Sequence, residues 1–212
     1  MYLPAQFAET RPDVLHALIR DHPFGMLVTQ GPAGLEANGL PFLIDADRGP
    51  HGTLRAHVAR ANPLWREARA DEDSLVVFQG PQAYISPAWY PTKAETGQVV
   101  PTWNYAIVQG RGRLRAVEDA TWVRQLVSDL TDHHEADRPK PWAVDDAPAG
   151  YIDKLLNAIV GIEIELTSLT GKWKVSQNRS AADRNGVVRG LTIENEGRDA
   201  AMATLVRDHG KG

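Results

Sequence analysis

Apolar residues recur at helical spacing near the start of the chain and at strand spacing soon afterwards. Thr10 suits an N-cap, Pro12 suits the first helical turn, and the apolar positions between 14 and 19 repeat as on one face of a helix. The pair His22-Pro23 ends this pattern. The sequence therefore predicts a first helix between Thr10 and His22.

Short strand-like runs follow, separated by turn signals rich in Gly, Pro and Asp. The alternation is most regular in residues 53–60, where Leu54, Ala56 and Val58 share one face. The predicted strands are 25–29, 35–45, 53–60, 74–80, 83–87, 102–117 and 159–169, the last continued by 171–175 after a bend.

Further helices are predicted after these strands. Asn62-Pro63 opens a short helix over 64–70, and residues 118–136 and 148–159 carry apolar stripes at helical spacing. The tail from Ser176 has helical pieces, with breaks near Asn185-Gly186 and at 194–197. Because tight turns join antiparallel neighbours, the pattern predicts a mainly β, α+β fold: a small barrel with peripheral helices. We expect one domain over residues 1–212, with 176–212 as a helical tail packed on the barrel.

Charge and composition narrow the possible partners. The formal net charge is −4 and the pI about 6.0, which disfavours direct binding to DNA through clustered Lys and Arg. No cysteine is present, so disulfides and thiolate ligands are excluded. No apolar run approaches the roughly 20 residues needed to span a bilayer, and no signal-peptide pattern opens the sequence. We predict a cytoplasmic protein with no membrane segment.

Two polar segments could hold an anion. Arg60 precedes the helix capped by Asn62, and a helix start offers free N–H groups; the alternative is a surface Arg beside an ordinary cap. Residues 171–180 contain Lys172, Lys174 and Arg179 with no acid, and the alternative there is a solvated strand end.

Two aromatic segments could hold a flat molecule. Residues 79–93 include Gln79, Ser86, Trp89 and Tyr90, and residues 102–105 read Thr-Trp-Asn-Tyr. Aromatic faces with a few polar groups suit a planar ligand, but these rings could equally fill the barrel and its interface. Two anion sites and two amide-rich aromatic clusters together favour flavin mononucleotide (FMN), which has one phosphate and one flat ring with polar edges.

No motif for a nucleophile, a nucleotide loop or a metal is present. Adjacent helical residues such as His133 and His134 point about 100° apart, so they cannot easily share one ion. The Gly-Arg-Gly-Arg run at 110–113 lies in or beside a strand and is not a phosphate loop. We predict no metal site and no dedicated catalytic residue.

The chain resembles the PaiB family, described as FMN-binding negative transcriptional regulators. The resemblance rests on the blocks AHVARANPLW, VVFQGPQAYISPAWYPTK, VPTWNYAIVQGRG and KVSQNRSAADRNGV. It implies the split β-barrel of pyridoxamine phosphate oxidase-like flavoproteins, a homodimer with FMN at its interface, and a role in negative transcriptional regulation. Family members often have His before the Leu-Pro of the second strand, where this chain has Gly39.

The residue patterns and the resemblance together predict which side chains bind FMN. We expect the phosphate near Arg60, Asn62 and Lys174, and the ring near Gln79, Trp103 and Asn104. The full set of predicted cofactor-binding residues is His57, Arg60, Asn62, Gln79, Ser86, Trp89, Thr102, Trp103, Asn104, Tyr105, Lys174, Gln177, Asn178 and Arg179.

Three other functions remain open at this point. A flavin-dependent oxidoreductase of the same fold would use NADH or NADPH, with the chemistry supplied by the cofactor, so the sequence does not decide whether the protein is an enzyme. A haem-binding split barrel would use His57 as the axial ligand. Direct DNA binding with an empty barrel is disfavoured by the charge balance.

Overall fold

The computed structural model describes residues 1–69, 71–194 and 199–209, and its strands form one sheet. The strands are β1 (Ala8–Glu9), β2 (Phe24–Gly31), β3 (Gly34–Pro41), β4 (Leu43–Asp45), β5 (Thr53–Ala59), β6 (Ser74–Ile85), β7 (Thr102–Val117) and β8 (Ile159–Lys174). Their order in the sheet is β3-β2-β6-β7-β8-β5-β4, and β1 pairs with β8. The pairs β2–β3, β2–β6, β4–β5, β5–β8 and β1–β8 are antiparallel.

Helices and short turns connect these strands. The α-helices are α1 (Pro12–Asp21), α2 (Leu64–Glu67), α3 (Thr92–Thr96), α4 (Ala120–Glu135), α5 (Ala149–Asn157), α6 (Ala181–Arg189) and α7 (Ala200–Asp208). The short turns are η1 (Ala5–Phe7), η2 (Pro87–Trp89) and η3 (Val144–Asp146), which are 3₁₀-helical, and η4 (Gly190–Glu194), which is π-helical. None of the helices in the described ranges is long and apolar enough to cross a membrane.

The chain divides into two compact units. The first unit contains residues 1–15, 79–108 and the described part of 170–212, and the second contains residues 16–78 and 109–169. The strands β6, β7 and β8 each contribute residues to both units. The expectation of a single domain with a packed helical tail stays a prediction.

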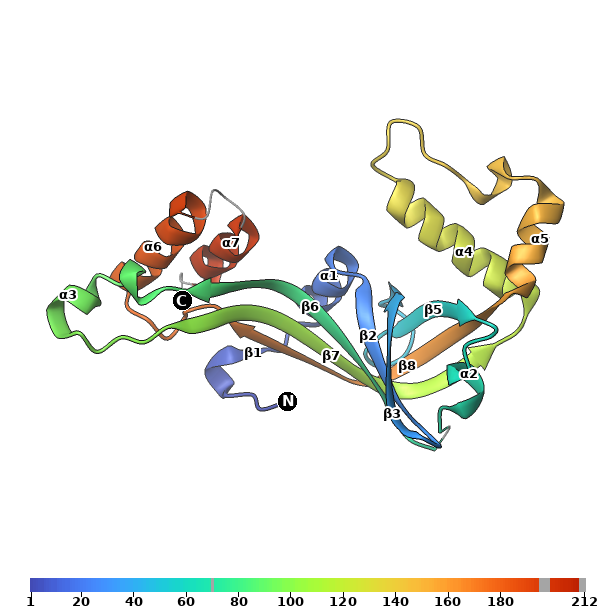
Figure 1. Cartoon of the computed structure of the whole chain (residues 1–212), viewed down its shortest axis with the longest axis horizontal. Coiled ribbons are helices and arrows are strands. Elements are labelled where there is room, and N and C mark those ends of the chain that lie inside the picture. The colour runs from blue at the N-terminus through green and yellow to red at the C-terminus, as the bar shows by residue number, and fades with distance from the viewer. Residues whose placement is uncertain (70, 195–198, 210–212) are drawn as a thin grey trace. The chain divides into compact units, whose positions relative to one another are not determined.

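The core of the second unit follows from strand alternation. Leu54, Ala56 and Val58 of β5 are buried, as their shared face predicted, and Ile162 and Ile164 of β8 are buried beside them. Figure 1 shows α4 and α5 next to each other in this unit. Burial of these apolar side chains removes their surface from water and stabilises the unit.

The core of the first unit is built where α6 and α7 pack together, as Figure 1 shows. Val187 on α6 and Met202 and Val206 on α7 are almost completely buried. Trp89 is 8% exposed and Tyr90 is 2% exposed, so these two aromatics belong mainly to the core. Their burial fits the core alternative, and the expectation that Trp89 binds a cofactor stays a prediction.

Most predicted elements are confirmed, and some boundaries were wrong. The predicted strand 102–117 coincides with β7, and the Gly-Arg-Gly-Arg run lies inside it. A Cβ atom at Gly112 would lie 2.1 Å from the Glu165 carbonyl oxygen, so this glycine permits the close approach of β7 and β8. The helices predicted over 118–136 and 148–159 are α4 and α5.

Among the described residues, the sequence pattern predicted two breaks that are not there and missed one that is. Residues 74–80 and 83–87 were predicted as two strands, but β6 continues through Gly80-Pro81 to Ile85. The range 35–45 is two strands, β3 and β4, and not one. The break at Asn185-Gly186 was also wrong, because α6 runs through both residues, while most of the break predicted at 194–197 lies outside the described residues.

Glu163 is a buried carboxylate of β8 in the second unit. It accepts hydrogen bonds from Arg48 at 2.5 Å and from Arg115 at 2.5 Å. Burial alone would raise the pKa of Glu163, but the hydrogen bonds from the two guanidinium groups outweigh it, so its pKa lies below the ordinary value of 4.5. The charged form of Glu163 therefore stabilises the fold.

We expect Glu163→Gln to lower the free energy of unfolding at pH 7 by about 1–2 kcal/mol, because two charge-assisted hydrogen bonds weaken and both arginines are half exposed. A carboxylate with a lowered pKa contributes stability above its unfolded pKa, and loses it as the pH falls through the folded value. The deficit should thus shrink as the pH falls below about 4.5. Urea unfolding at several pH values measures it, and Glu95→Gln, at an exposed position of α3, is the control. A deficit that does not change with pH would contradict this account.

Candidate functional site

Two polar segments that the sequence singled out, residues 102–105 and 174–179, meet in the first unit. The Lys174 ammonium group donates hydrogen bonds to the Thr102 hydroxyl and, at 2.6 Å, to the Trp103 carbonyl oxygen. The Asn104 side-chain amide donates to the Ser176 hydroxyl at 2.9 Å. The first residues of β7 are thus joined to the last residue of β8 and to the turn after it.

These contacts surround a small cavity of about 90 Å³, which we call the cationic cradle. Its lining residues are Tyr90, Val100, Thr102, Asn104, Lys174, Ser176, Asn178 and Arg179. The lining has two cations and no carboxylate. The predicted binding residues Thr102, Asn104, Lys174, Asn178 and Arg179 are therefore brought together.

The cradle is electropositive. Burial lowers the pKa of Lys174, and the nearby charges of Lys172 and Arg179 lower it further. The guanidinium of Arg179 lies 4.8 Å from the centre of the Tyr90 ring. An anion in the cradle would stabilise both cations, because it would supply the opposite charge that no lining residue provides.

Tyr90 lines the cradle but was not among the predicted binding residues. Its hydroxyl group is buried and donates no hydrogen bond to any residue in the described part of the chain. Burial raises the pKa of this hydroxyl, so it stays protonated and can donate a hydrogen bond at neutral pH. The signal in the sequence was its place in the aromatic segment 79–93, which does not tell a core ring from a lining one.

Ser176 adopts an unusual backbone conformation at the cradle. Its φ angle is +64°, and among the non-glycine residues that the structure describes it alone has a positive φ. A left-handed conformation costs a side-chain-bearing residue roughly 1–2 kcal/mol. The hydrogen bond from the buried Asn104 amide offsets part of this cost and holds the Ser176 hydroxyl in the cavity wall.

An exposed aromatic surface also lies in the first unit. A hollow in this surface has a volume of about 480 Å³. It is lined by Met1, Gln79, Gln82, Trp103, Tyr105 and Ile107. Trp103 is 54% exposed. The centres of the Trp103 and Tyr84 rings lie 6.1 Å apart in an edge-to-face arrangement. Trp103 is therefore not a core residue of the first unit. Its backbone carbonyl accepts the Lys174 hydrogen bond, so this surface adjoins the cationic cradle.

Three other predicted residues of the first unit have structural roles. The Ser86 hydroxyl accepts a hydrogen bond from the Ala88 N–H at the start of η2. The Gln177 side chain accepts from the Val175 N–H at 2.8 Å and donates to the Gln6 carbonyl at 3.1 Å. Trp89 packs against α6. None of these three lines the cationic cradle.

The predicted residues Arg60 and Asn62 belong to the second unit, and both are engaged there. Arg60 donates to Glu118 at 2.6 Å and to the carbonyl oxygens of Asn157 and Ile159. Asn62 accepts from the Leu64 N–H and donates to Asn38 at 3.0 Å. The charge of Arg60 is thus already paired with a carboxylate.

His57, also in the second unit, lies at a mainly apolar cavity of about 330 Å³. The lining residues are Pro41, His57, Val127, Leu130, Thr131, His134, Glu135 and Trp142. Burial lowers the pKa of His57, so the imidazole is neutral at pH 7. Its Nδ1 atom is buried and has no hydrogen bond to any described residue.

The fold of this chain is similar to that of a solved structure. The chain aligns with the FAD- and haem-binding protein of Mycobacterium smegmatis at a TM-score of 0.56 and 16% identity, over 79% of this chain and 73% of that one. This likeness of fold agrees with the predicted α+β split barrel.

The family follows from the sequence matches. A family model described as "Putative FMN-binding domain" matches residues 1–168, and the chain belongs to this family. An uncharacterized protein of Emericella nidulans is 36% identical over 100% of this chain and 98% of its own length. The "Protease synthase and sporulation protein PAI 2" of Bacillus subtilis is 32% identical over 98% of this chain and 97% of its own. The resemblance to the PaiB family is confirmed.

The strained Ser176 gives a test of the cradle's architecture. We expect Ser176→Ala to lower the free energy of unfolding by about 1–3 kcal/mol, because it leaves the buried Asn104 amide without its acceptor. Ser176→Gly should be less destabilising by roughly 1 kcal/mol, since glycine tolerates a φ of +64°. Urea denaturation of both variants measures the difference. If the glycine variant is the less stable of the two, the backbone strain assigned to Ser176 is wrong.

Proposed function

We propose that the protein is an FMN-binding homodimer with a role as a negative transcriptional regulator. The observation that carries this proposal is the meeting of residues 102–105 and 174–179, which puts a cationic cradle next to an exposed aromatic surface. FMN has one phosphate and one planar ring, which match these two features in kind. Membership of a family described by FMN binding supports the same cofactor.

In this proposal the phosphate of FMN occupies the cationic cradle. A cavity of about 90 Å³ is well below the roughly 300 Å³ at which small-molecule sites usually begin, so it admits one charged group and not a ring system. Lys174 and Arg179 supply charge, and the Tyr90 hydroxyl supplies a further donor. Arg60, which the sequence pattern suggested for the phosphate, is a weaker candidate because Glu118 already pairs with it.

The ring of FMN would then contact the aromatic surface around Trp103. Trp103 and Tyr105 offer flat apolar area, and Gln79 and Gln82 offer amide groups that can bond the polar edge of the ring. When bound, FMN would supply redox chemistry that the side chains alone do not have. The chain's own contribution is to bind and orient the cofactor.

A second copy of the chain would complete this site. Within the first unit, Trp103 is 54% exposed, and Tyr84 and Val100 are also exposed. Large exposed aromatic side chains at one place are typical of protein interfaces. Dimerisation would bury them and exclude water from a ring bound beside them.

The support for a regulatory role is the name of the Bacillus subtilis relative, which refers to protease synthesis and sporulation. The net charge of −4 argues against broad contacts to DNA phosphates. Regulation in the cytoplasm would therefore act through a protein partner or through the state of the flavin. An NAD(P)H-dependent flavin oxidoreductase is the rival, and steady turnover of NADH or NADPH with an electron acceptor would favour it.

We expect purified protein to quench the fluorescence of added FMN in a saturable way, and Lys174→Met and Arg179→Met to raise the Kd by about 10- to 100-fold. The reason is that a hydrogen bond to a charged group contributes roughly 1.5–3 kcal/mol. The measurement is an FMN titration at constant ionic strength.

Two controls separate lost binding from lost folding. Lys93→Met removes an exposed cation of the same unit that does not line the cradle, and should leave the Kd unchanged. The melting temperature of each variant without FMN shows whether it folds. Folded Lys174→Met and Arg179→Met proteins that bind FMN as the unmodified chain does would rule out the cradle as the phosphate site.

Haem is the second candidate cofactor, favoured by the unpartnered Nδ1 of the neutral His57 at an apolar cavity. The similar Mycobacterium smegmatis protein is named for haem as well as FAD. If haem binds here, added hemin should give a Soret band that His57→Ala abolishes and His133→Ala, at an exposed histidine, leaves unchanged. No band, or a band insensitive to His57→Ala, would exclude this assignment.

A further inference from the structure

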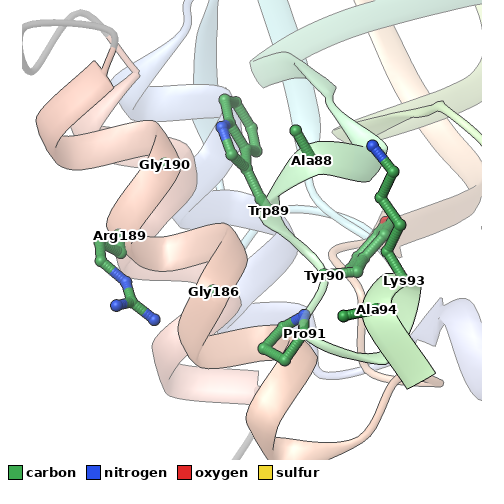
Figure 2. Close-up of a pocket in the computed structure, with 9 residues that line it drawn as sticks. All are labelled: Ala88, Trp89, Tyr90, Pro91, Lys93, Ala94, Gly186, Arg189 and Gly190. Carbon is green, nitrogen blue, oxygen red and sulfur yellow. The ribbon is translucent and has the colours of Figure 1, made fainter.

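A second cavity of the first unit lies outside the proposed FMN site. It has a volume of about 600 Å³ and lies between α6 and residues 88–94 (Figure 2). The residues that line it are Ala88, Trp89, Tyr90, Pro91, Lys93, Ala94, Gly186, Arg189 and Gly190. Its volume falls within the range of roughly 300–1,000 Å³ typical of small-molecule sites.

The floor of this cavity is rigid because α6 packs closely on Trp89. A Cβ atom at Gly190 would lie 2.2 Å from the indole ring, and one at Gly186 would lie 1.9 Å from the Trp89 carbonyl oxygen. Only glycine fits at these two positions, which explains why α6 contains glycine despite a helix cost of roughly 1 kcal/mol. Gly190 also begins the π-helical turn η4, a rare geometry that is frequent at functional sites.

Two cations that have no partner among the described residues border the cavity from different elements. Lys93 is on α3 and Arg189 is on α6, as Figure 2 shows, and both are exposed. Among the described residues, neither side chain has a hydrogen bond or an ion pair. None of the nine lining residues is acidic.

A buried acid joins the two elements that carry these cations. Asp183, one turn before Gly186 on α6, accepts hydrogen bonds from the Thr92 N–H at 3.3 Å and from the Thr92 hydroxyl at 3.0 Å. These bonds join α6 to the start of α3, so they hold together the two elements that carry Arg189 and Lys93. The two elements that border the cavity are therefore fixed relative to each other.

We propose that this cavity binds a small organic anion with two acidic groups on an apolar body. Lys93 and Arg189 would each pair with one acidic group. Ala88, Pro91 and Ala94 give apolar walls for the carbon skeleton between these groups. An inorganic anion alone would leave most of a cavity of about 600 Å³ unfilled. This site is separate from the cationic cradle, which uses Lys174 and Arg179.

The test is a titration with three probes that share a benzene ring and differ in charge: isophthalate with two carboxylates, benzoate with one, and the neutral isophthalamide. Amide chemical shifts of the ¹⁵N-labelled protein report the position of binding. We expect isophthalate to shift the Gly186 and Gly190 signals in a saturable way, benzoate to bind about 2- to 5-fold more weakly, and the neutral diamide not to bind. The factor follows from the usual contribution of one exposed ion pair.

Variants test which cations are used. Lys93→Gln and Arg189→Gln should each weaken isophthalate binding about 2- to 5-fold, and Lys174→Met should not change it. The unliganded spectrum verifies the fold of each variant. Isophthalate shifts confined to Asn104 and Ser176, no saturable shift, or equal binding of the diamide would each overturn the proposal. Because FMN is titrated separately, failure of this site and failure of the FMN site are distinguishable.

Discussion

The hydrogen bonds of Lys174 join the ends of two neighbouring strands, at positions that are 72 residues apart in the sequence. Thr102 begins β7 and Lys174 ends β8, and these strands are neighbours in the sheet. The pairing of the strands therefore decides that the TWNY segment and the KVSQNR segment share one place. Every feature of the candidate site in the first unit depends on this: the cradle, the orientation of Trp103, and the contact between Asn104 and Ser176.

The residues of the cationic cradle lower the stability of the fold in two ways. Lys174 is partly desolvated beside two further cations, and Ser176 carries a side chain in a left-handed conformation. Unpaired positive charge and backbone strain at one place are typical of binding sites, because folding alone selects against both. By contrast, the buried carboxylate Glu163 in the second unit has two arginine partners, as a structural ion pair requires.

The sequence predicted the site segments well and their individual roles less well. The strand 102–117 could be predicted because it alternates regularly over its whole length. Gly80-Pro81 suggested a turn, but β2 pairs with β6 only over Leu75–Val77, so Pro81 lies where β2 requires no hydrogen bond from β6. Gly186 suggested a helix break, but the close approach of Trp89 requires a glycine inside α6. Both errors arise from tertiary contacts, which a local pattern does not contain.

Tertiary contacts also decide which of the predicted cations are available to a ligand. Arg60 and Arg179 look equivalent in the sequence, since each lies in a polar segment near a predicted helix start. In the structure Glu118, 58 residues away in the sequence, pairs with Arg60. Arg179 lies over an aromatic ring in a cavity whose lining has no carboxylate. A phosphate competes poorly with a carboxylate that is already held in contact, so the absence of an acidic neighbour identifies a binding cation better than its local motif does. Lys93 and Arg189 meet this criterion at the second cavity of the first unit.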